Sequence, residues 1–189
     1  MKVSAFLAVS LDGYIARPNG DIDWLEQANA LVPKGEDCGF GDFFTNIDCL
    51  VMGRKSFEKV LSFPQWPYAK KPVIVLSRNG IQIPASLEET VSCSSQSPED
   101  LCQSLSQAGM KRIYVDGGQT VRAFLFAGLL DELTVTRIPV LIRQGIPLFE
   151  ISAELSNDQV KDTWFELIET RSWSFGFTQE VWKIKGKSS

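Results

Sequence analysis

Two stretches of this chain pass from a strand-like apolar run into glycine and then into a segment with helical spacing. The clearer one covers residues 113–120, where the run ends at Asp116 and is followed by Gly117 and Gly118. Beyond these glycines, apolar residues recur at helical spacing at Val121, Phe124, Leu125 and Leu129. The pattern predicts a buried strand, a tight turn and a helix whose free N–H groups form an anion site. The alternative is that this strand-to-helix joint is purely structural and that its glycines only relieve backbone strain, because short glycine motifs also arise by chance.

The second joint lies upstream and carries positive charge. A strand-like run at residues 50–52 leads into the segment 53–56, Gly-Arg-Lys-Ser, and helical spacing follows. A third apolar run, residues 72–76, ends in Ser77 and Arg78. In open α/β sheets, ligands bind beyond the carboxyl ends of the strands, so these polar tips are candidate binding groups. The alternative is that each cation is an ordinary solvated residue at the end of an element.

The order of the segments predicts the fold class. The run at residues 3–9 is nearly continuous in apolar residues, which is typical of a central strand covered on both faces. Strand-like and helix-like segments then alternate as far as Ala127, and strands predominate after it. Residues 164–173 and 175–184 alternate in polarity and predict an antiparallel pair. We therefore expect an α/β fold with a mixed, mostly parallel sheet, helices on both faces and an antiparallel C-terminal strand pair.

Local signals add detail to this order. Residues 10–16 predict a turn, and residues 33–41 predict a surface loop. The Ser-Pro pair at residues 97–98 predicts the start of a helix. We expect one domain over residues 1–185 and a polar tail at residues 186–189.

Composition excludes several kinds of chemistry. The chain has no histidine, which rules out Ser-His-Asp and Cys-His catalysis and histidine-ligated metals. Its four cysteines form no C-x-x-C pair, so we expect no metal site. A net charge of −4 and a pI near 5.0 give no general attraction to nucleic acid or to an anionic membrane. Without a signal peptide or a long apolar run, we expect a reduced cytoplasmic protein with a small-molecule substrate.

The cationic tips indicate the class of ligand. Two helix starts together with Arg54, Lys55 and Arg78 offer several separate anion-binding groups at one edge of the predicted sheet. A ligand with several phosphates in fixed places fits these groups better than a single anion does. A dinucleotide with a ribose phosphate fits best, because arginine presents a planar fork suited to phosphate oxygens.

These segments resemble the dihydrofolate reductase family. Residues 51–58 are similar to its strand-to-helix cofactor motif, with Ser56 where threonine is usual. Residues 75–78 are similar to the strand tip that holds the ribose phosphate, and residues 115–118 to the double-glycine turn beside the pyrophosphate. Residues 8–15 resemble the first strand and mobile loop that line the nicotinamide. The resemblance implies a dihydrofolate reductase-like three-layer α/β/α fold and NADPH as cofactor, with these contacts: Ala8, Ile15, Gly53, Arg54, Lys55, Ser56, Ser77, Arg78, Gly117, Gly118, Gln119 and Thr120.

Within this superfamily, the details resemble the riboflavin-biosynthesis reductases more than the folate reductases. Folate reductases carry an acidic residue on the helix that precedes the strand at residues 50–52. No acidic residue of this chain lies at the corresponding position. Residues 11–13, Asp116 and the segments 130–133 and 139–141 are similar to the riboflavin branch. The segment 142–144 replaces most of that branch's glycine-rich turn, which leaves the substrate open. The resemblance implies a homodimer and reduction of a small heterocycle such as a ribosylamino-pyrimidine phosphate, without a deaminase domain.

The implied reaction is hydride transfer from C4 of NADPH to a C=N or C=O carbon, with the protein orienting the reactants. A proton must also reach the product, and the candidates are Asp116, Asp12, Asp23 or a bound water. We favour Asp116 because it ends a buried strand, where desolvation can raise its pKa. The alternatives are that Asp116 caps the next helix and that Asp12 forms a turn.

Three further residues are candidates for substrate contact: Asp23, Trp24 and Thr136. Trp24 is equally suited to the core, and Thr136 to an ordinary strand. Two other functions stay open at this point. One is dihydrofolate reduction proper, and the other is a non-catalytic protein that binds NADP.

Overall fold

The computed structural model describes residues 1–149 and 162–186. The chain divides into two compact units that interleave along the sequence. The first unit is Met1–Ala5 with Phe40–Leu130, and the second is Phe6–Gly39 with Asp131–Ser189. Strand β1 (Lys2–Ser10) begins in the first unit and ends in the second. Among the described residues, no helix is both long and apolar enough to cross a membrane.

The first unit is built on parallel strands in the order β5-β4-β3-β6-β1. The members other than β1 are β3 (Cys49–Gly53), β4 (Val73–Leu76), β5 (Val91–Ser94) and β6 (Arg112–Asp116). Strands β1, β3, β4 and β6 follow the apolar runs of the sequence, whereas β5, with the sequence Val-Ser-Cys-Ser, has no such run. Cys49, Leu50, Val51 and Met52 are fully buried, which explains the continuous apolar pattern of β3 and makes Cys49 a small core residue.

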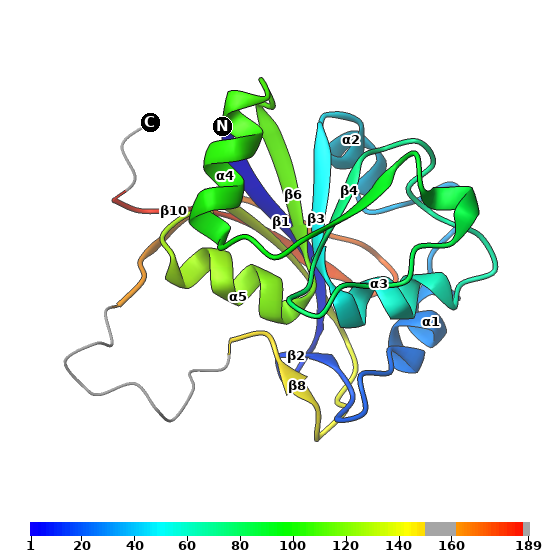
Figure 1. Cartoon of the computed structure of the whole chain (residues 1–189). Coiled ribbons are helices and arrows are strands. Elements are labelled where there is room, and N and C mark those ends of the chain that lie inside the picture. The colour runs from blue at the N-terminus through cyan, green and yellow to red at the C-terminus, as the bar shows by residue number, and fades with distance from the viewer. Residues whose placement is uncertain (150–161, 187–189) are drawn as a thin grey trace. The chain divides into compact units, whose positions relative to one another are not determined.

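Helices cover both faces of these strands. They are α2 (Phe40–Thr45), α3 (Arg54–Leu61), the short 3₁₀ helix η1 (Ala85–Leu87), α4 (Pro98–Gln107) and α5 (Gly118–Phe126). Figure 1 shows α4 and α5 in front of the strands. On the other face, the ring of Phe43 in α2 meets Tyr114 of β6 edge-on, with centroids 5.1 Å apart. The β3–α3–β4 connection and the β5–α4–β6 connection run in opposite directions across the sheet. Because such crossovers are right-handed, α3 lies on the face opposite α4, which is the face that α2 covers.

The second unit contains two antiparallel groups. Strands β7 (Glu132–Ile138), β10 (Thr178–Ile184) and β9 (Phe165–Ser172) follow the order β7-β10-β9. This confirms the predicted C-terminal strand pair. Strand β2 (Tyr14–Ala16) pairs with β8 (Ile146–Pro147), and α1 (Asp23–Asn29) completes the unit. Its core gathers Trp24, Ala28, Cys38, Ile138, Ile142 and Phe177.

The elements form an α/β fold with a mostly parallel, mixed sheet and an antiparallel C-terminal pair, as the sequence predicts. Two local expectations differ from the structure. Residues 10–16 were expected to form only a turn, but Tyr14–Ala16 form β2 because Ile146–Pro147 supply a distant pairing partner. The loop expected at residues 33–41 is shorter, because α2 begins at Phe40. The single-domain boundary at residue 185 stays a prediction, and residues 187–189 of the expected tail lie outside the described residues.

Candidate functional site

The register of the first unit places three predicted tips side by side. In the β3–β4 pair, Gly53 lies opposite Leu76, and in the β3–β6 pair Met52 lies opposite Asp116. Beyond these residues, β4 leads into Ser77, β3 leads into the start of α3, and β6 leads into Gly117. The strands are parallel and in register, so all three tips lie along the same carboxyl edge.

The two glycine joints at this edge pack against each other. Gly117 has a φ of +83°, a conformation that favours glycine. A Cβ atom on Gly117 would overlap the hydroxyl oxygen of Ser56. Reciprocally, a Cβ atom on Gly53 would lie 3.2 Å from the Thr120 hydroxyl oxygen. Gly117 thus has no room for a side chain beside the Ser56 hydroxyl, and Gly53 has little room beside Thr120, because the starts of α3 and α5 pack closely together.

These two helix starts differ from that of α4. Ser97 caps α4 by accepting a hydrogen bond from the Asp100 N–H, and two acidic residues occupy its first turn. The N-caps of α3 and α5 are glycines, with no side-chain cap and no acidic residue in the first turn. Their first N–H groups and the positive ends of their dipoles therefore remain available to an anion. The contrast within one unit favours a binding role over a merely relaxed turn.

The predicted cations at the edge are not equivalent. Arg54 forms an i, i+4 ion pair with Glu58 at 3.2 Å. Lys55 and Arg78 are exposed and have no ion pair within the part of the chain that the structure describes. The hydroxyl of Ser77 donates to the Gly80 carbonyl oxygen at 2.8 Å, which closes the turn that carries Arg78. Gln119 is exposed in the first turn of α5, and Gly118 is buried there.

Asp116 ends β6 at the same edge. Its Oδ1 accepts a hydrogen bond from the Tyr114 hydroxyl at 3.0 Å, and its carboxyl also accepts one from the Gly117 N–H. Burial raises the pKa of Asp116, the two hydrogen bonds lower it, and the net direction is upward. The pKa values of Tyr114 and Tyr68 are raised by burial and then by Asp116, so both phenols keep their protons.

An aromatic cluster beside Asp116 was not predicted from the sequence. Ring contacts run from Trp66 to Tyr68 (5.1 Å), from Tyr68 to Phe44 (5.8 Å) and from Phe44 to Phe40 (5.5 Å). Phe40 in turn contacts Tyr114 at 6.2 Å. The signal available in the sequence was aromatic density at residues 40–44 and 66–68, but only the fold brings these segments to the Tyr114 face of the sheet.

In the second unit, Asp12 is a structural anchor. Its carboxylate accepts hydrogen bonds from the Ser10 hydroxyl (2.6 Å) and from the backbone N–H groups of Ile142 (3.3 Å) and Arg143 (2.7 Å). Burial would raise the pKa of Asp12, but these bonds lower it below its usual value. The contacts favour the turn-forming alternative for Asp12. They also fix the segment that replaces the glycine-rich turn of the riboflavin branch.

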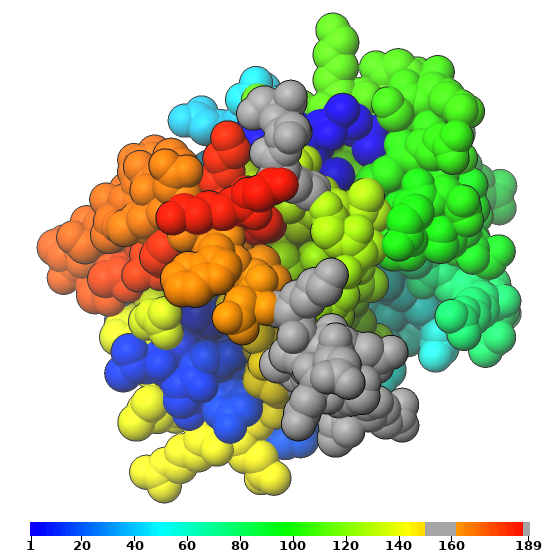
Figure 2. Space-filling model, turned by 90° about the vertical axis from the view of Figure 1, so that its left-hand side faces the viewer, coloured from blue at the N-terminus to red at the C-terminus, as the bar shows by residue number. Residues whose placement is uncertain are grey.

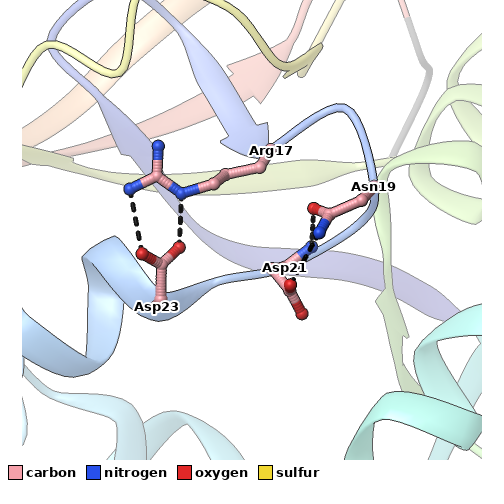
Figure 3. Close-up of polar contacts among 4 residues, drawn as sticks. All are labelled: Arg17, Asn19, Asp21 and Asp23. Atoms are coloured by element: carbon pink, nitrogen blue, oxygen red, sulfur yellow. Dashed lines mark hydrogen bonds and ion pairs between the residues drawn. The ribbon is translucent and has the colours of Figure 1, made fainter.

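Asp23 is held by an arginine. Its two carboxylate oxygens accept hydrogen bonds from Arg17 Nε at 2.5 Å and Nη2 at 2.9 Å (Figure 3). The Arg17 hydrogen bond lowers the pKa of Asp23. The same loop is closed by Asn19, whose side-chain amide donates to Asp21 at 2.7 Å. The two oxygens of Asp23 therefore face a permanent cation, which disfavours protonation of this residue.

Trp24, Thr136, Ala8 and Ile15 lie in the same unit. Trp24 is 2% exposed and packs in the core cluster, with Ala8 against it; its Nε1 has no hydrogen-bond partner among the described residues. Ile15 is half-buried in β2. Thr136 is buried, and its hydroxyl oxygen accepts a hydrogen bond from the Gln179 amide at 2.8 Å. Gln179 was not predicted as a functional residue, although an inward-facing polar residue in an alternating strand was its signal.

Comparisons with known proteins agree with this fold. The profile of the RibD C-terminal domain matches residues 1–169. YwjB of Bacillus subtilis (strain 168), itself uncharacterised, is 35% identical over 162 residues, which is 83% of this chain and 86% of YwjB. YyaP of the same organism, also uncharacterised, is 28% identical over 193 residues, covering 95% and 93% of the two chains.

Solved structures show the same architecture. A protein from Shewanella sp. PV-4, provisionally named a riboflavin biosynthesis protein, has a TM-score of 0.86 and 35% identity, with 98% and 99% of the two chains covered. The deaminase/reductase of Thermotoga maritima has a TM-score of 0.70 at 16% identity, with 97% of this chain and 56% of that chain covered. These likenesses place the chain in the dihydrofolate reductase-like superfamily with the fold of the RibD-type reductases. The chain belongs to the RibD C-terminal domain family.

Proposed function

We propose that this protein is an NADPH-dependent reductase that transfers hydride to a small heterocyclic substrate of the ribosylamino-pyrimidine type. The observation that carries the proposal is the pair of uncapped helix starts, α3 and α5, packed together through Gly117 and Ser56. Membership in the RibD C-terminal domain family supports the same activity. The Thermotoga maritima relative in fold is named a phosphoribosylaminouracil reductase, which supports the substrate class.

The residues of the first unit fit NADPH. The free N–H groups at the starts of α3 and α5 suit the pyrophosphate, with Ser56 and Thr120 at the joints. Arg78 is an exposed arginine on a closed turn, which suits the ribose phosphate, and Lys55 adds a second exposed cation; neither is paired with an acidic side chain of the described residues. Bound NADPH would supply the hydride.

Asp116 is the proposed proton donor. Its carboxyl ends β6 immediately before the glycine joint, and burial raises its pKa, so it holds a proton more readily than an exposed aspartate does. Asp12 and Asp23 fit this role less well, because their carboxylates already accept hydrogen bonds that lower their pKa values. In the second unit, Asp23, Trp24 and Thr136 stay proposed substrate contacts, although the burial of Trp24 in the core cluster favours its core role. We propose Asp12 as the residue that holds the segment at Ile142 and Arg143.

We also propose a homodimer that pairs through β9. This edge strand is exposed along nearly its whole length, with Leu167 and Ile168 49% and 53% exposed. Figure 2 shows the strands β9 and β10, in orange and red, at the surface of the molecule. An edge strand with exposed apolar side chains is a natural pairing site for a second copy of the same strand.

The test of the proposed function is turnover. The purified protein and its Asp116→Asn variant are mixed with NADPH and with separate pyrimidine, pterin, folate and quinone acceptors, and the loss of NADPH absorbance is followed. Reduction of a ribosylamino-pyrimidine by the wild type, and much slower reduction by the variant, supports the proposal. Reduction of dihydrofolate alone contradicts the substrate class. NADPH binding without reduction of any acceptor contradicts the enzymatic role.

A further inference from the structure

Tyr114 and Asp116 are two residues apart on β6, so their side chains lie on the same face of the sheet. Tyr114 is 4% exposed, and its hydroxyl donates to Oδ1 of Asp116 at 3.0 Å. The tyrosine ring is held edge-on by Phe43, with centroids 5.1 Å apart and an interplanar angle of 86°. A rigid, buried donor is thus aimed at one oxygen of the carboxyl group.

We propose that Tyr114 is the positioning residue of Asp116: its hydroxyl holds Oδ1 as a hydrogen-bond acceptor, so the acid proton is carried on Oδ2. A protonated carboxyl has one carbonyl oxygen, which accepts, and one hydroxyl oxygen, which donates. A donor fixed at Oδ1 therefore selects the tautomer with the proton on Oδ2. The consequence for catalysis rests on the proposed function, because it assigns to Oδ2 the proton that Asp116 delivers.

Within residues 1–149 and 162–186, the groups found against the carboxyl are the Tyr114 hydroxyl on β6, the Gly117 N–H at the joint and the Tyr68 phenol from the segment before β4. Both phenols stay protonated through the pH range in which a carboxyl titrates, so neither adds a charge of its own. The Tyr114 hydroxyl stabilises the ionised form of Asp116 more than the neutral form, because a hydrogen bond to a charged acceptor is the stronger one. The Tyr114 hydrogen bond therefore also lowers the pKa of Asp116, against the larger upward effect of burial.

The test is a titration of the Asp116 carboxyl carbon by ¹³C NMR, with the resonance assigned by its absence in Asp116→Asn. In Tyr114→Phe the midpoint shifts to higher pH than in the wild type, because the donor to the ionised form is lost. Tyr68→Phe is the matched control; it removes the other nearby phenol, for which no hydrogen bond to Asp116 is seen, and its midpoint stays at the wild-type value. An unchanged or lowered midpoint in Tyr114→Phe overturns the proposal.

A second measurement keeps the test decisive if Tyr114→Phe does not fold. The chain has three tyrosines, so incorporation of 3-fluorotyrosine gives a ¹⁹F spectrum in which Tyr114 can be assigned with Tyr14→Phe and Tyr68→Phe. In the wild type, the ¹⁹F chemical shift of Tyr114 should change with pH in a step that has the same midpoint as the Asp116 titration. This step should be absent in Asp116→Asn. A Tyr114 signal without this step overturns the proposal.

Neither titration needs cofactor or turnover. The positioning role of Tyr114 and the proposed enzymatic function can therefore be disproved independently. If the titrations succeed but no acceptor is reduced, Tyr114 positions Asp116 and the proposed enzymatic role is wrong. If an acceptor is reduced, the alkaline limb of the turnover pH profile, where Asp116 loses its proton, should shift to higher pH in Tyr114→Phe and not in Tyr68→Phe. Turnover in which Tyr114→Phe leaves this limb in place contradicts the positioning role alone.

Discussion

Gly117 and Ser56 pack so closely that a Cβ atom on Gly117 would overlap the Ser56 hydroxyl oxygen and lie 3.3 Å from Ser56 Cβ. This contact joins the start of α5 to the start of α3 and so defines the candidate anion site. Gly117 meets two demands at once, a positive φ and the absence of a side chain, and each can be tested by substitution.

Gly117→Ala should destabilise the protein by about 3 kcal/mol or more, because backbone strain and overlap with Ser56 add together. Gly128→Ala is the matched control, since Gly128 has a φ of +67° and open space around it. It should lose only about 1–2 kcal/mol, from strain alone. Ser56→Ala in the Gly117→Ala background should recover part of the loss. Urea unfolding of the four proteins checks this, and equal losses for Gly117→Ala and Gly128→Ala would refute the contact.

Asp116→Asn should separate activity from stability. Burial raises the pKa of folded Asp116, so the stability that its proton provides is fully present below the unfolded pKa and is lost as the pH rises through the folded pKa. The uncharged Asn variant should therefore be more stable than the wild type at neutral pH, and this advantage should shrink on acidification. Turnover should fall about a hundredfold, with little change in NADPH affinity. Urea unfolding at several pH values and steady-state rates test both parts; full activity in the variant contradicts the proton-donor role.

Asp12→Ala should behave in the opposite way with pH. Hydrogen bonds hold the pKa of Asp12 below its usual value, so its contribution is present above the unfolded pKa and is lost as the pH falls through the folded pKa. At neutral pH the variant should be less stable by about 1 kcal/mol, a small value because solvent screens this exposed carboxylate. The difference should vanish in acid. A stability difference that grows on acidification contradicts the anchoring role.

Ile168→Lys should convert a homodimer into a monomer, because it replaces one of the two exposed apolar side chains of the edge strand β9 with a charge. Leu141→Lys is the control, since Leu141 is a similarly exposed leucine outside that strand, at 59%. Light scattering after size exclusion gives the mass of each protein. A wild type that is monomeric at every concentration, or a dimer unaffected by Ile168→Lys, contradicts pairing through β9.

Much of the first unit was predictable because its signals are local. Apolar runs, Gly117 and the Ser97 cap each report on their own neighbours in sequence, and the strands and helix starts follow from them. Parallel strands then bring their carboxyl tips together without further information. The prediction that Asp116 ends a buried strand at this edge is confirmed.

The contacts that were not predictable join residues far apart in sequence. Asp12 accepts hydrogen bonds from Ile142 and Arg143, and Gln179 reaches Thr136 and Cys38. No local pattern fixes these partners, because they depend on which loops and strands meet after folding. A carboxylate read from the sequence alone therefore looked equally suited to catalysis and to anchoring.

We propose that the first unit holds NADPH through the starts of α3 and α5 and through Arg78. The most direct test of this proposal is a titration of the wild type with NADPH and with NADH, followed by nicotinamide fluorescence, with Arg78→Ala alongside. We expect NADPH to bind about ten- to a hundredfold more tightly than NADH, because one charged hydrogen-bonding group contributes a difference in affinity of this size. Arg78→Ala should remove this preference and leave NADH affinity unchanged, whereas Arg54→Ala, whose arginine is already paired with Glu58, should affect both cofactors equally. Absence of binding to either nucleotide, or a preference that survives Arg78→Ala, would contradict this mode of NADPH binding.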